Sequence, residues 1–268
     1  MLPEGHSGTA LITGASMGIG SVYADRLARR GHDLILVARY RPRLEDFASL
    51  LRNRWGVSVE ALPADLTQKA DLFRVEQRLR DDPAITILIN NAGTTAPAAL
   101  VGADTNALEQ IIQLNITAVT RLSAAAATAF ASRRRGTVVN IASVTALLPD
   151  LLNGTYSGSK AFVLNLTQSM QSELKDCGVR VQAVLPGAVR TDIWKHAETD
   201  VSTLPPGIVM EAEECVDAAL AGLDQGEAVT IPSLPDPADW AAFIAARRRL
   251  EPNLSRDRAA ERYRTPIG

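Results

Sequence analysis

Short runs rich in β-branched residues alternate with longer segments of helical spacing along most of the chain. Several of these runs are apolar almost throughout, which is typical of parallel strands that helices cover on both faces. The alternation therefore predicts an α/β fold with one doubly wound, about seven-stranded parallel sheet flanked by helices. The predicted strands are Thr9–Thr13, Asp33–Val37, Val57–Leu62, Ile85–Ile89, Thr137–Ile141, Val179–Val184 and Ala228–Ile231.

The segments between these runs have the spacing of helices that cross from one parallel strand to the next. In a sheet of this kind, ligands bind beyond the carboxyl ends of the strands. We therefore expect functional side chains in the loops that follow the strands. The predicted helices are Gly18–Arg30, Arg43–Arg54, Gln68–Arg80, Thr105–Ser132, Thr155–Lys175 and Glu211–Leu223.

Three glycines follow the first predicted strand, where the first helix begins. They allow a tight turn, let backbone N–H groups approach a pyrophosphate and permit close packing of helix on strand. A glycine cluster alone is weak evidence, because turns need glycine for steric reasons. Its place between strand and helix favours a dinucleotide site, and the candidate cofactor-binding residues are Gly14, Ser16, Met17, Gly18, Ile19 and Gly20.

Arg39 stands at the end of the second predicted strand, with Arg41 and Arg43 close behind and no carboxylate among them. An acidic residue at this place binds the 2′-hydroxyl of NAD, whereas an arginine accommodates the 2′-phosphate of NADP. A guanidinium can hold a phosphate through two parallel hydrogen bonds. NADP(H) is therefore the predicted cofactor. The alternative is that these arginines are only the solvated start of a helix.

Polar residues also follow the third and fourth predicted strands. Asp65 could accept the amino group of adenine, the role we favour, or cap the helix that starts near Thr67. The fourth strand leads into a turn whose small residues would let a ribose approach the backbone, although an ordinary Asn-rich turn is the alternative. The candidate cofactor-binding residues of these two loops are Asp65, Leu66, Asn91, Ala92 and Gly93.

Tyr156 and Lys160 are four residues apart in a predicted helix, and Ser143 follows the strand before it. Positions i and i+4 share one face of a helix, so the phenol and the ammonium can point at one ligand. The positive charge favours the phenolate. We therefore expect Lys160 to lower the pKa of Tyr156 from its ordinary value of about 10, so that it exchanges protons nearer neutral pH.

Charge and composition exclude several classes of function. The formal net charge is −2, which gives no electrostatic reason to expect a nucleic-acid or anionic-membrane partner. The two cysteines, Cys177 and Cys215, have no metal-binding spacing. The N-terminal residues lack the layout of a signal peptide, and Arg121 interrupts the most alanine-rich stretch. We expect a cytoplasmic protein that binds no metal, nucleic acid or membrane.

Together these motifs resemble the short-chain dehydrogenase/reductase superfamily over about residues 9–191. The resemblance implies a single-domain Rossmann-type fold and a catalytic tetrad of Asn115, Ser143, Tyr156 and Lys160. Tyr156 would be the general acid or base, and Ser143 would bind the substrate oxygen. Lys160 would hold the nicotinamide ribose, and Asn115 would support a water-linked proton relay to it. The further implied cofactor-binding residues are Tyr156, Lys160, Pro186, Gly187, Val189 and Thr191.

The resemblance implies an NADP(H)-dependent oxidoreductase that interconverts a small-molecule carbonyl and an alcohol. One alternative is a 3-oxoacyl carrier-protein reductase that docks its carrier on Arg133–Arg135, and another is an NADP(H)-binding sensor or scaffold without turnover. Met17 stands where many NADP-preferring relatives have a basic residue, so NAD(H) stays open as a second cofactor. The resemblance also implies a homodimer or homotetramer built through the helices at 105–132 and 155–175.

The domain organisation follows from these motifs. We expect one domain over residues 1–268, with the cofactor-binding and catalytic part at 9–187. Residues 188–210 interrupt the alternation with prolines and polar residues, and a long irregular segment at this end of the sheet predicts a substrate lid. Residues 232–268 form a C-terminal extension with a predicted amphipathic helix, Trp240–Arg249. Its role stays open between packing on its own domain, a subunit contact and covering the site.

Overall fold

The computed structural model describes residues 7–97, 100–196 and 200–264. Its strands are β1 (Thr9–Thr13), β2 (Asp33–Ala38), β3 (Val59–Pro63), β4 (Ile85–Asn90), β5 (Gly136–Ile141), β6 (Val179–Val184), β7 (Ala188–Val189), β8 (Val209–Met210) and β9 (Val229–Thr230). Its helices are α1 (Gly18–Arg29), α2 (Arg41–Trp55), α3 (Lys69–Asp81), α4 (Thr105–Ile111), α5 (Val119–Arg133), α6 (Gly154–Leu174), α7 (Ile193–His196), α8 (Ala212–Asp224) and α9 (Pro237–Arg248). A π-helical segment, Ile112–Ala118, joins α4 to α5, and short 3₁₀ helices span Val144–Ala146, Val201–Thr203, Glu251–Asn253 and Glu261–Tyr263.

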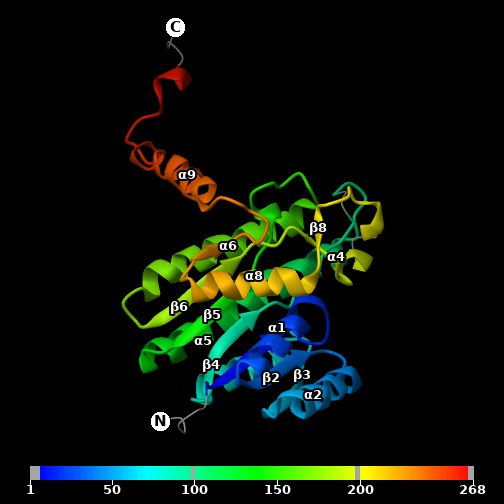
Figure 1. Cartoon of the computed structure of the whole chain (residues 1–268). Coiled ribbons are helices and arrows are strands. Elements are labelled where there is room, and N and C mark those ends of the chain that lie inside the picture. The colour runs from blue at the N-terminus through cyan, green and yellow to red at the C-terminus, as the bar shows by residue number, and fades with distance from the viewer. Residues whose placement is uncertain (1–6, 98–99, 197–199, 265–268) are drawn as a thin grey trace. The chain divides into compact units, whose positions relative to one another are not determined.

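Seven parallel strands form the central sheet, in the order β3-β2-β1-β4-β5-β6-β9 (Figure 1). All seven predicted strands are present, and the predicted doubly wound fold is confirmed. The strand order reverses between β1 and β4, so the loops after these two strands diverge at the carboxyl edge of the sheet. A crevice at this reversal is where such folds bind ligands.

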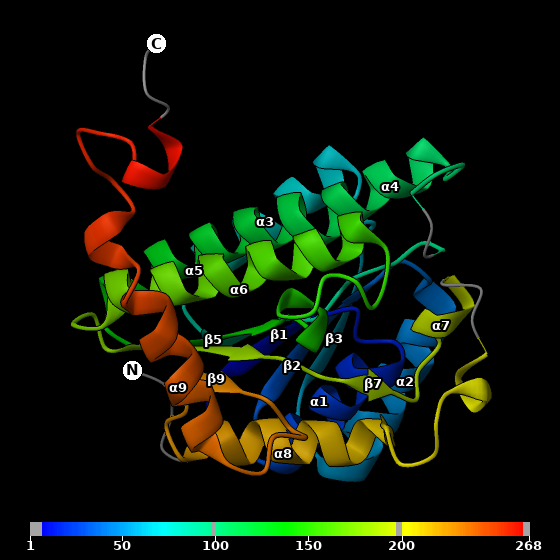
Figure 2. The ribbon, with the colours of Figure 1, turned by 90° about the horizontal axis from the view of Figure 1, so that it is seen from above.

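Helices cover both faces of the sheet, as Figure 2 shows, with α1, α2 and α8 on one side and α3, α5 and α6 on the other. The strands are buried on both faces because alternate residues point to opposite helix layers. Ile12 and Leu36 pack with Tyr23 of α1, whereas Leu11 and Leu88 pack with Phe130 of α5. This double burial explains why the strands read as nearly continuous apolar runs.

Two helices depart from their predicted bounds for identifiable reasons. The helix α2 begins at Arg41 rather than Arg43, because Pro42 suits the first turn, where no N–H donor is needed. The predicted continuous helix 105–132 is wrong, since the π-helical segment Ile112–Ala118 interrupts it. Such π turns are rare and frequently lie at functional sites.

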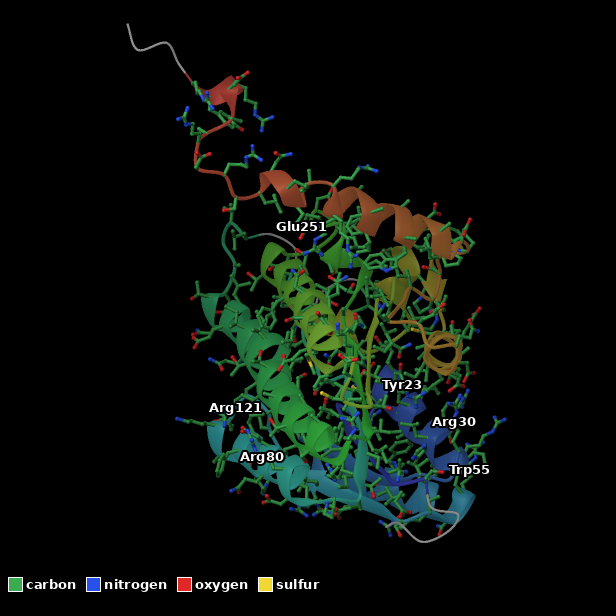
Figure 3. The ribbon with its side chains drawn as sticks, turned by 90° about the vertical axis from the view of Figure 1, so that its left-hand side faces the viewer. Tyr23, Arg30, Trp55, Arg80, Arg121 and Glu251 are labelled. Atoms are coloured by element: carbon green, nitrogen blue, oxygen red, sulfur yellow. The ribbon has the colours of Figure 1, made fainter. Side chains whose placement is uncertain are left out.

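A charged contact joins α3 to α5 on the surface of the second helix layer. Glu76 is buried and accepts hydrogen bonds from Arg80 at 2.7 Å and from Arg121 at 2.5 Å. Figure 3 shows the two labelled arginines close together, one from each helix. Because the arginine side chains remain partly in solvent, we expect this contact to orient the helices more than to stabilise them.

The chain divides into two compact units, one that ends at Pro232 and one that starts at Ser233. In the second unit, α9 begins at Pro237, three residues before the predicted start. Asp236 explains the earlier start, because its carboxylate accepts the Ala238 N–H at 2.8 Å. The rings of Trp240 and Phe243 are stacked 5.4 Å apart on this helix.

Within the described parts of the chain, no helix is both long and apolar enough to span a membrane.

Candidate active site

The glycine turn between β1 and α1 packs closely against the loop that follows β4. Gly14 and Gly18 have φ angles of +65° and +55°, in the left-handed region that favours glycine. A Cβ on Gly14 would lie 2.8 Å from Asn91 Nδ2 and 2.9 Å from Ala92 Cα. The other predicted turn residues, Ser16, Met17 and Ile19, are partly or fully exposed. The turn therefore leaves its outer backbone accessible to a ligand.

Thr13 ties this turn to the Asn91 loop. Its Oγ1 accepts the backbone N–H groups of Asn91 and Ala92, each at 3.0 Å, and Asn91 Nδ2 donates to Thr13 O at 2.9 Å. Thr13 was not among the predicted site residues. Its buried position at a strand end was the available signal, but a strand-end threonine is too common to distinguish it.

Gly20 makes the closest backbone contact in the turn. A Cβ there would overlap Gly14 O and Asn91 Nδ2. We expect Gly20→Ala to lower the free energy of unfolding by about 1–3 kcal/mol, because the backbone cannot yield as a side chain would. The control is Gly158→Ala, because Gly158 is a helical glycine with open space at its Cβ position. Urea denaturation measures the free energy of unfolding of both variants. The control should be neutral or stabilising by up to about 1 kcal/mol, and equal losses in both variants would contradict this explanation.

The arginines after β2 differ in their surroundings. Arg39 is exposed directly after the strand, and Arg41 is paired with Glu45 at 3.1 Å. The third, Arg43, is exposed on the first turn of α2. Since none of residues 38–43 is acidic, the end of β2 offers a phosphate a cationic environment.

Asp65 makes local contacts in the loop after β3. Its Oδ1 accepts the Thr67 N–H at 3.0 Å and the Thr67 hydroxyl at 2.7 Å. Asp65 therefore stabilises the turn that precedes α3. This role is close to the predicted alternative of a helix cap, although α3 itself begins only at Lys69. The adenine contact stays a prediction. Leu66 is buried, so only its backbone could meet a ligand.

Ser143, Tyr156 and Lys160 converge beyond the end of β5. Tyr156 lies in the first turn of α6, which begins after Asn153, whose Oδ1 accepts the Thr155 N–H at 2.8 Å. The hydroxyls of Ser143 and Tyr156 are hydrogen-bonded to one another. Lys160 Nζ lies 5.6 Å from the Tyr156 ring centre and donates to Ile141 O at 3.0 Å. All three residues are at most 7% exposed, so their polar groups are almost completely shielded from solvent.

Asn115 lies in the π-helical segment and links three parts of the site. Its Oδ1 accepts the Thr94 N–H at 2.9 Å, and its Nδ2 donates to Thr94 O at 2.9 Å and to Ser159 Oγ at 3.0 Å. Ser159 donates in turn to Tyr156 O at 2.6 Å. A Cβ on the neighbouring Gly93 would lie 3.3 Å from Asn115 Oδ1 and 3.5 Å from Lys160 Nζ. The four predicted catalytic residues therefore lie in one site.

The expectation that Lys160 lowers the pKa of Tyr156 is wrong for this structure. Burial raises the pKa of Tyr156 to about 12, and the hydrogen bond from Ser143 opposes this rise only in part. Burial also lowers the pKa of Lys160 from 10.5 to about 8. Removal from water disfavours the charged form of each group. At neutral pH the phenol is protonated and the lysine carries its charge, which suits Tyr156 to donating a proton.

The segment after β6 connects this group to the glycine turn. Pro186 O accepts the Val144 N–H at 3.0 Å and the Ser143 hydroxyl at 3.5 Å. Gly187 has open space on its Cβ side, and Val189 is buried. Thr191 Cγ2 lies 3.0 Å from the Cβ position of Gly18. The predicted residues Pro186, Gly187, Val189 and Thr191 thus border the site.

The two ends of the predicted lid, 188–210, are held together. Its ends form the two-stranded sheet β7-β8, and Arg190 N donates to Met210 O at 2.9 Å. Trp194 Nε1 donates to Val189 O at 2.8 Å. Ile193 packs against the apolar cluster that contains Tyr156. Residues 197–199 lie outside the described part of the chain, and a closing motion stays a prediction.

Apolar side chains pack around Tyr156. Tyr156 packs with Ala96 and Ile111, and Leu108 and Leu152 lie against them. The loops after β4 and β5 and the lid segment also present large exposed apolar residues, namely Leu100, Val101, Leu148, Leu151 and Ile208. Apolar side chains therefore pack against Tyr156 and are also exposed on the loops that follow β4 and β5.

Comparison with known proteins gives consistent matches. The sequence model of the short chain dehydrogenase family matches residues 8–202. A short-chain dehydrogenase from Sphingobium yanoikuyae, solved in complex with NADPH, is 52% identical, with a TM-score of 0.93 over 96% of this chain and 100% of that one. A bulky-bulky ketone specific alcohol dehydrogenase from Comamonas testosteroni is 46% identical, with a TM-score of 0.88 over 96% of this chain and 98% of that one.

A curated relative, human 17-beta-hydroxysteroid dehydrogenase type 3, is 36% identical over 72% of this chain. The match covers 63% of the human protein, so the chain spans less than two thirds of that relative's length.

Proposed function

The chain belongs to the short-chain dehydrogenase family, as its sequence motifs predicted, and from this premise we propose that it is an NADP(H)-dependent oxidoreductase that interconverts a carbonyl and an alcohol. The observation that carries the proposal is the buried group of Ser143, Tyr156 and Lys160. A proton donor, a hydrogen-bonding hydroxyl and a cation lie together beside a glycine turn. Carbonyl reduction needs this combination, because negative charge develops on the substrate oxygen as a proton is delivered to it.

The residues present fit a nicotinamide dinucleotide with a 2′-phosphate. The glycine turn has no room for side chains at Gly14 and Gly20, so the backbone itself forms its surface. Arg39 supplies a cation after β2 where NAD-binding relatives of the fold would need a carboxylate. The NADPH complex of the Sphingobium dehydrogenase supports the same choice. When bound, the reduced nicotinamide supplies the hydride that the carbonyl carbon accepts.

The chain's own residues handle the proton and the charge. Tyr156 donates its phenolic proton to the substrate oxygen in reduction and accepts it back in oxidation. Ser143 donates a hydrogen bond to the same oxygen, which stabilises the charge that develops there. Lys160 holds a positive charge beside the phenol and would bind the nicotinamide ribose. Asn115 fixes the Thr94 loop and Ser159, and would support a proton path toward Lys160.

We propose that the substrate is a ketone with large apolar substituents. Support comes from the apolar side chains around Tyr156 and from the exposed leucines of the loops after β4 and β5, Leu100, Leu148 and Leu151. The Comamonas enzyme acts on bulky-bulky ketones, and the human relative is a hydroxysteroid dehydrogenase. A large apolar substrate would cover these side chains and exclude water from the proton transfer.

Carrier-protein reductase activity has less support, because Arg133–Arg135 precede β5, at the amino edge of the sheet. The site lies at the carboxyl edge, a full strand length away at about 3.3 Å per residue. Arg133 and Arg134 also donate to the carbonyls of Asp82 and Asp176. A carrier docked on these arginines would face the wrong edge of the sheet.

A screen of the purified protein tests the proposal. NADPH and NADH oxidation is followed against ketones, aldehydes, oxoacyl thioesters and steroids. We expect turnover with NADPH and a bulky aryl or alicyclic ketone, and slower turnover with NADH. Binding of NADPH without turnover on any member of the panel would favour the sensor or scaffold alternative instead.

A further inference from the structure

Asn153 lies three residues before Tyr156 and is completely buried, with an exposed fraction of 0%. Its amide makes two hydrogen bonds, one to its own helix and one to a distant loop. Oδ1 accepts the Thr155 N–H at 2.8 Å in the first turn of α6, and Nδ2 donates to Pro97 O at 3.1 Å in the loop that follows β4. One side chain therefore joins the start of the helix that carries Tyr156 to a separate loop.

Ser157 makes a second connection from the same turn of α6. It is buried, and its Oγ donates to Pro149 O at 3.1 Å in the loop that follows β5. The Ser157 N–H donates to Asn153 O at 2.9 Å, which closes the turn between the two residues. The turn that contains Tyr156 is thus tied to the loops after both β4 and β5.

The choice of asparagine at position 153 is not explained by helix capping alone. Serine and aspartate cap helices about as well as asparagine does, because each offers an oxygen to the helix N–H. An aspartate, however, would place a second oxygen without a proton against Pro97 O, and a serine has no second polar atom to reach it. The bond to Pro97 is therefore the contact that needs an amide.

We propose that Asn153 is a positioning residue, which holds the hydroxyl of Tyr156 where the substrate oxygen must lie. This inference rests on the proposed function. The loop that Asn153 binds contributes Ala96 to the apolar cluster around Tyr156, and Asn115 binds the same loop through Thr94. The two asparagines thus fix one loop against the helix of the proton donor. Because a reacting group misplaced by about 1 Å can slow a reaction by about 10²-fold, loss of one of them should change the rate.

Single-turnover reduction tests the proposal, with enzyme in excess over NADPH and a saturating amount of the ketone that the wild-type protein reduces fastest in the screen. Under these conditions the rate constant does not depend on the fraction of the protein that is folded. Asn153→Ser keeps an acceptor for the Thr155 N–H but loses the bond to Pro97 O. We expect its rate constant to fall by about 10–100-fold, while the dissociation constant for NADPH changes by less than about twofold.

Three further variants separate the bond to Pro97 from the helix cap. Asn153→Asp also keeps the cap and loses the bond to Pro97, so it should be slow as well and serves if Asn153→Ser does not fold. Asn153→Ala loses both bonds and should be as slow as Asn153→Ser but less stable to heat. Asp236→Ala is the matched control, because Asp236 caps α9 through the Ala238 N–H, also at 2.8 Å, and α9 carries no predicted site residue. Its rate constant should stay within about twofold of wild type.

The other outcomes are distinct. A wild-type rate constant in Asn153→Ser or Asn153→Asp would overturn the proposal and leave Asn153 as a helix cap. A loss of NADPH affinity without a slower single turnover would overturn it as well, because it would place the effect on the cofactor. A wild-type protein that reduces no ketone of the screen would instead refute the proposed function itself.

Discussion

Replacing Tyr156 with phenylalanine is expected to reduce kcat/KM for NADPH-dependent ketone reduction by about 10²–10⁴-fold, the contribution of a positioned general acid. The ring stays in its apolar cluster with Ala96 and Ile111, so the site keeps its shape. Only the hydroxyl and its hydrogen bond with Ser143 are lost. Steady-state kinetics with a bulky ketone and saturating NADPH measures the loss.

The dissociation constant for NADPH serves as the control for this variant. It should change little in Tyr156→Phe, because the phenolic hydroxyl is assigned to the substrate and not to the phosphates. A full reduction rate in Tyr156→Phe would remove Tyr156 from the mechanism. A large loss of NADPH affinity without a loss of kcat would show that the hydroxyl binds the cofactor instead.

Replacing Lys160 with methionine is expected to lower activity and to raise stability. Loss of the ammonium should lower kcat/KM by about 10²–10³-fold, as for other removed electrostatic groups. The same change should raise the free energy of unfolding at neutral pH by roughly 1–2 kcal/mol. The buried charge is costly, as the lowering of its pKa to about 8 indicates, while the lost hydrogen bond to Ile141 O offsets part of the gain.

The pH dependence of this stability difference has a definite sign. Below pH 8 Lys160 is protonated in both the folded and the unfolded chain, so the wild-type protein carries the full free-energy cost of the buried ammonium. Between pH about 8 and its ordinary value of 10.5, the unfolded state holds more protons than the folded state. Wild-type stability therefore rises with pH relative to Lys160→Met, and the gap closes. Reduction activity should fall over the same range as the ammonium is lost.

Urea unfolding from pH 7 to 10 checks this sign, with Lys175→Met as the control. Lys175 is exposed at the end of the same helix and should change stability by less than about 0.5 kcal/mol at each pH. A wild-type protein that loses stability relative to Lys160→Met as the pH rises would contradict the assignment of a buried, destabilising ammonium.

Much of the fold could be predicted, because the strands are buried on both sides and therefore apolar throughout. The parallel sheet, with loops that meet at one edge, follows from that alternation, whereas the pairing of β1 with both β2 and β4 does not. The convergence of Ser143, Tyr156 and Lys160 was also predictable, since loops after neighbouring parallel strands share one edge.

The remaining features depend on packing that residue types do not encode. The π turn at Asn115 arises from tertiary contacts with Thr94 and Ser159, whereas local propensity over 105–132 is simply helical. The direction of the pKa shift at Tyr156 depends on burial, which the spacing to Lys160 could not reveal.

The central claim is that the buried phenol of Tyr156 completes a hydride transfer from NADPH to a ketone. A single-turnover reaction with 4,4-dideuterated NADPH, equimolar enzyme and a bulky ketone tests it, followed by mass spectrometry of the product. The prediction is an alcohol with one deuterium on the carbinol carbon, formed by the wild-type protein and not by Tyr156→Phe on the same timescale. An alcohol without the label, or equal yields from both proteins, would contradict it.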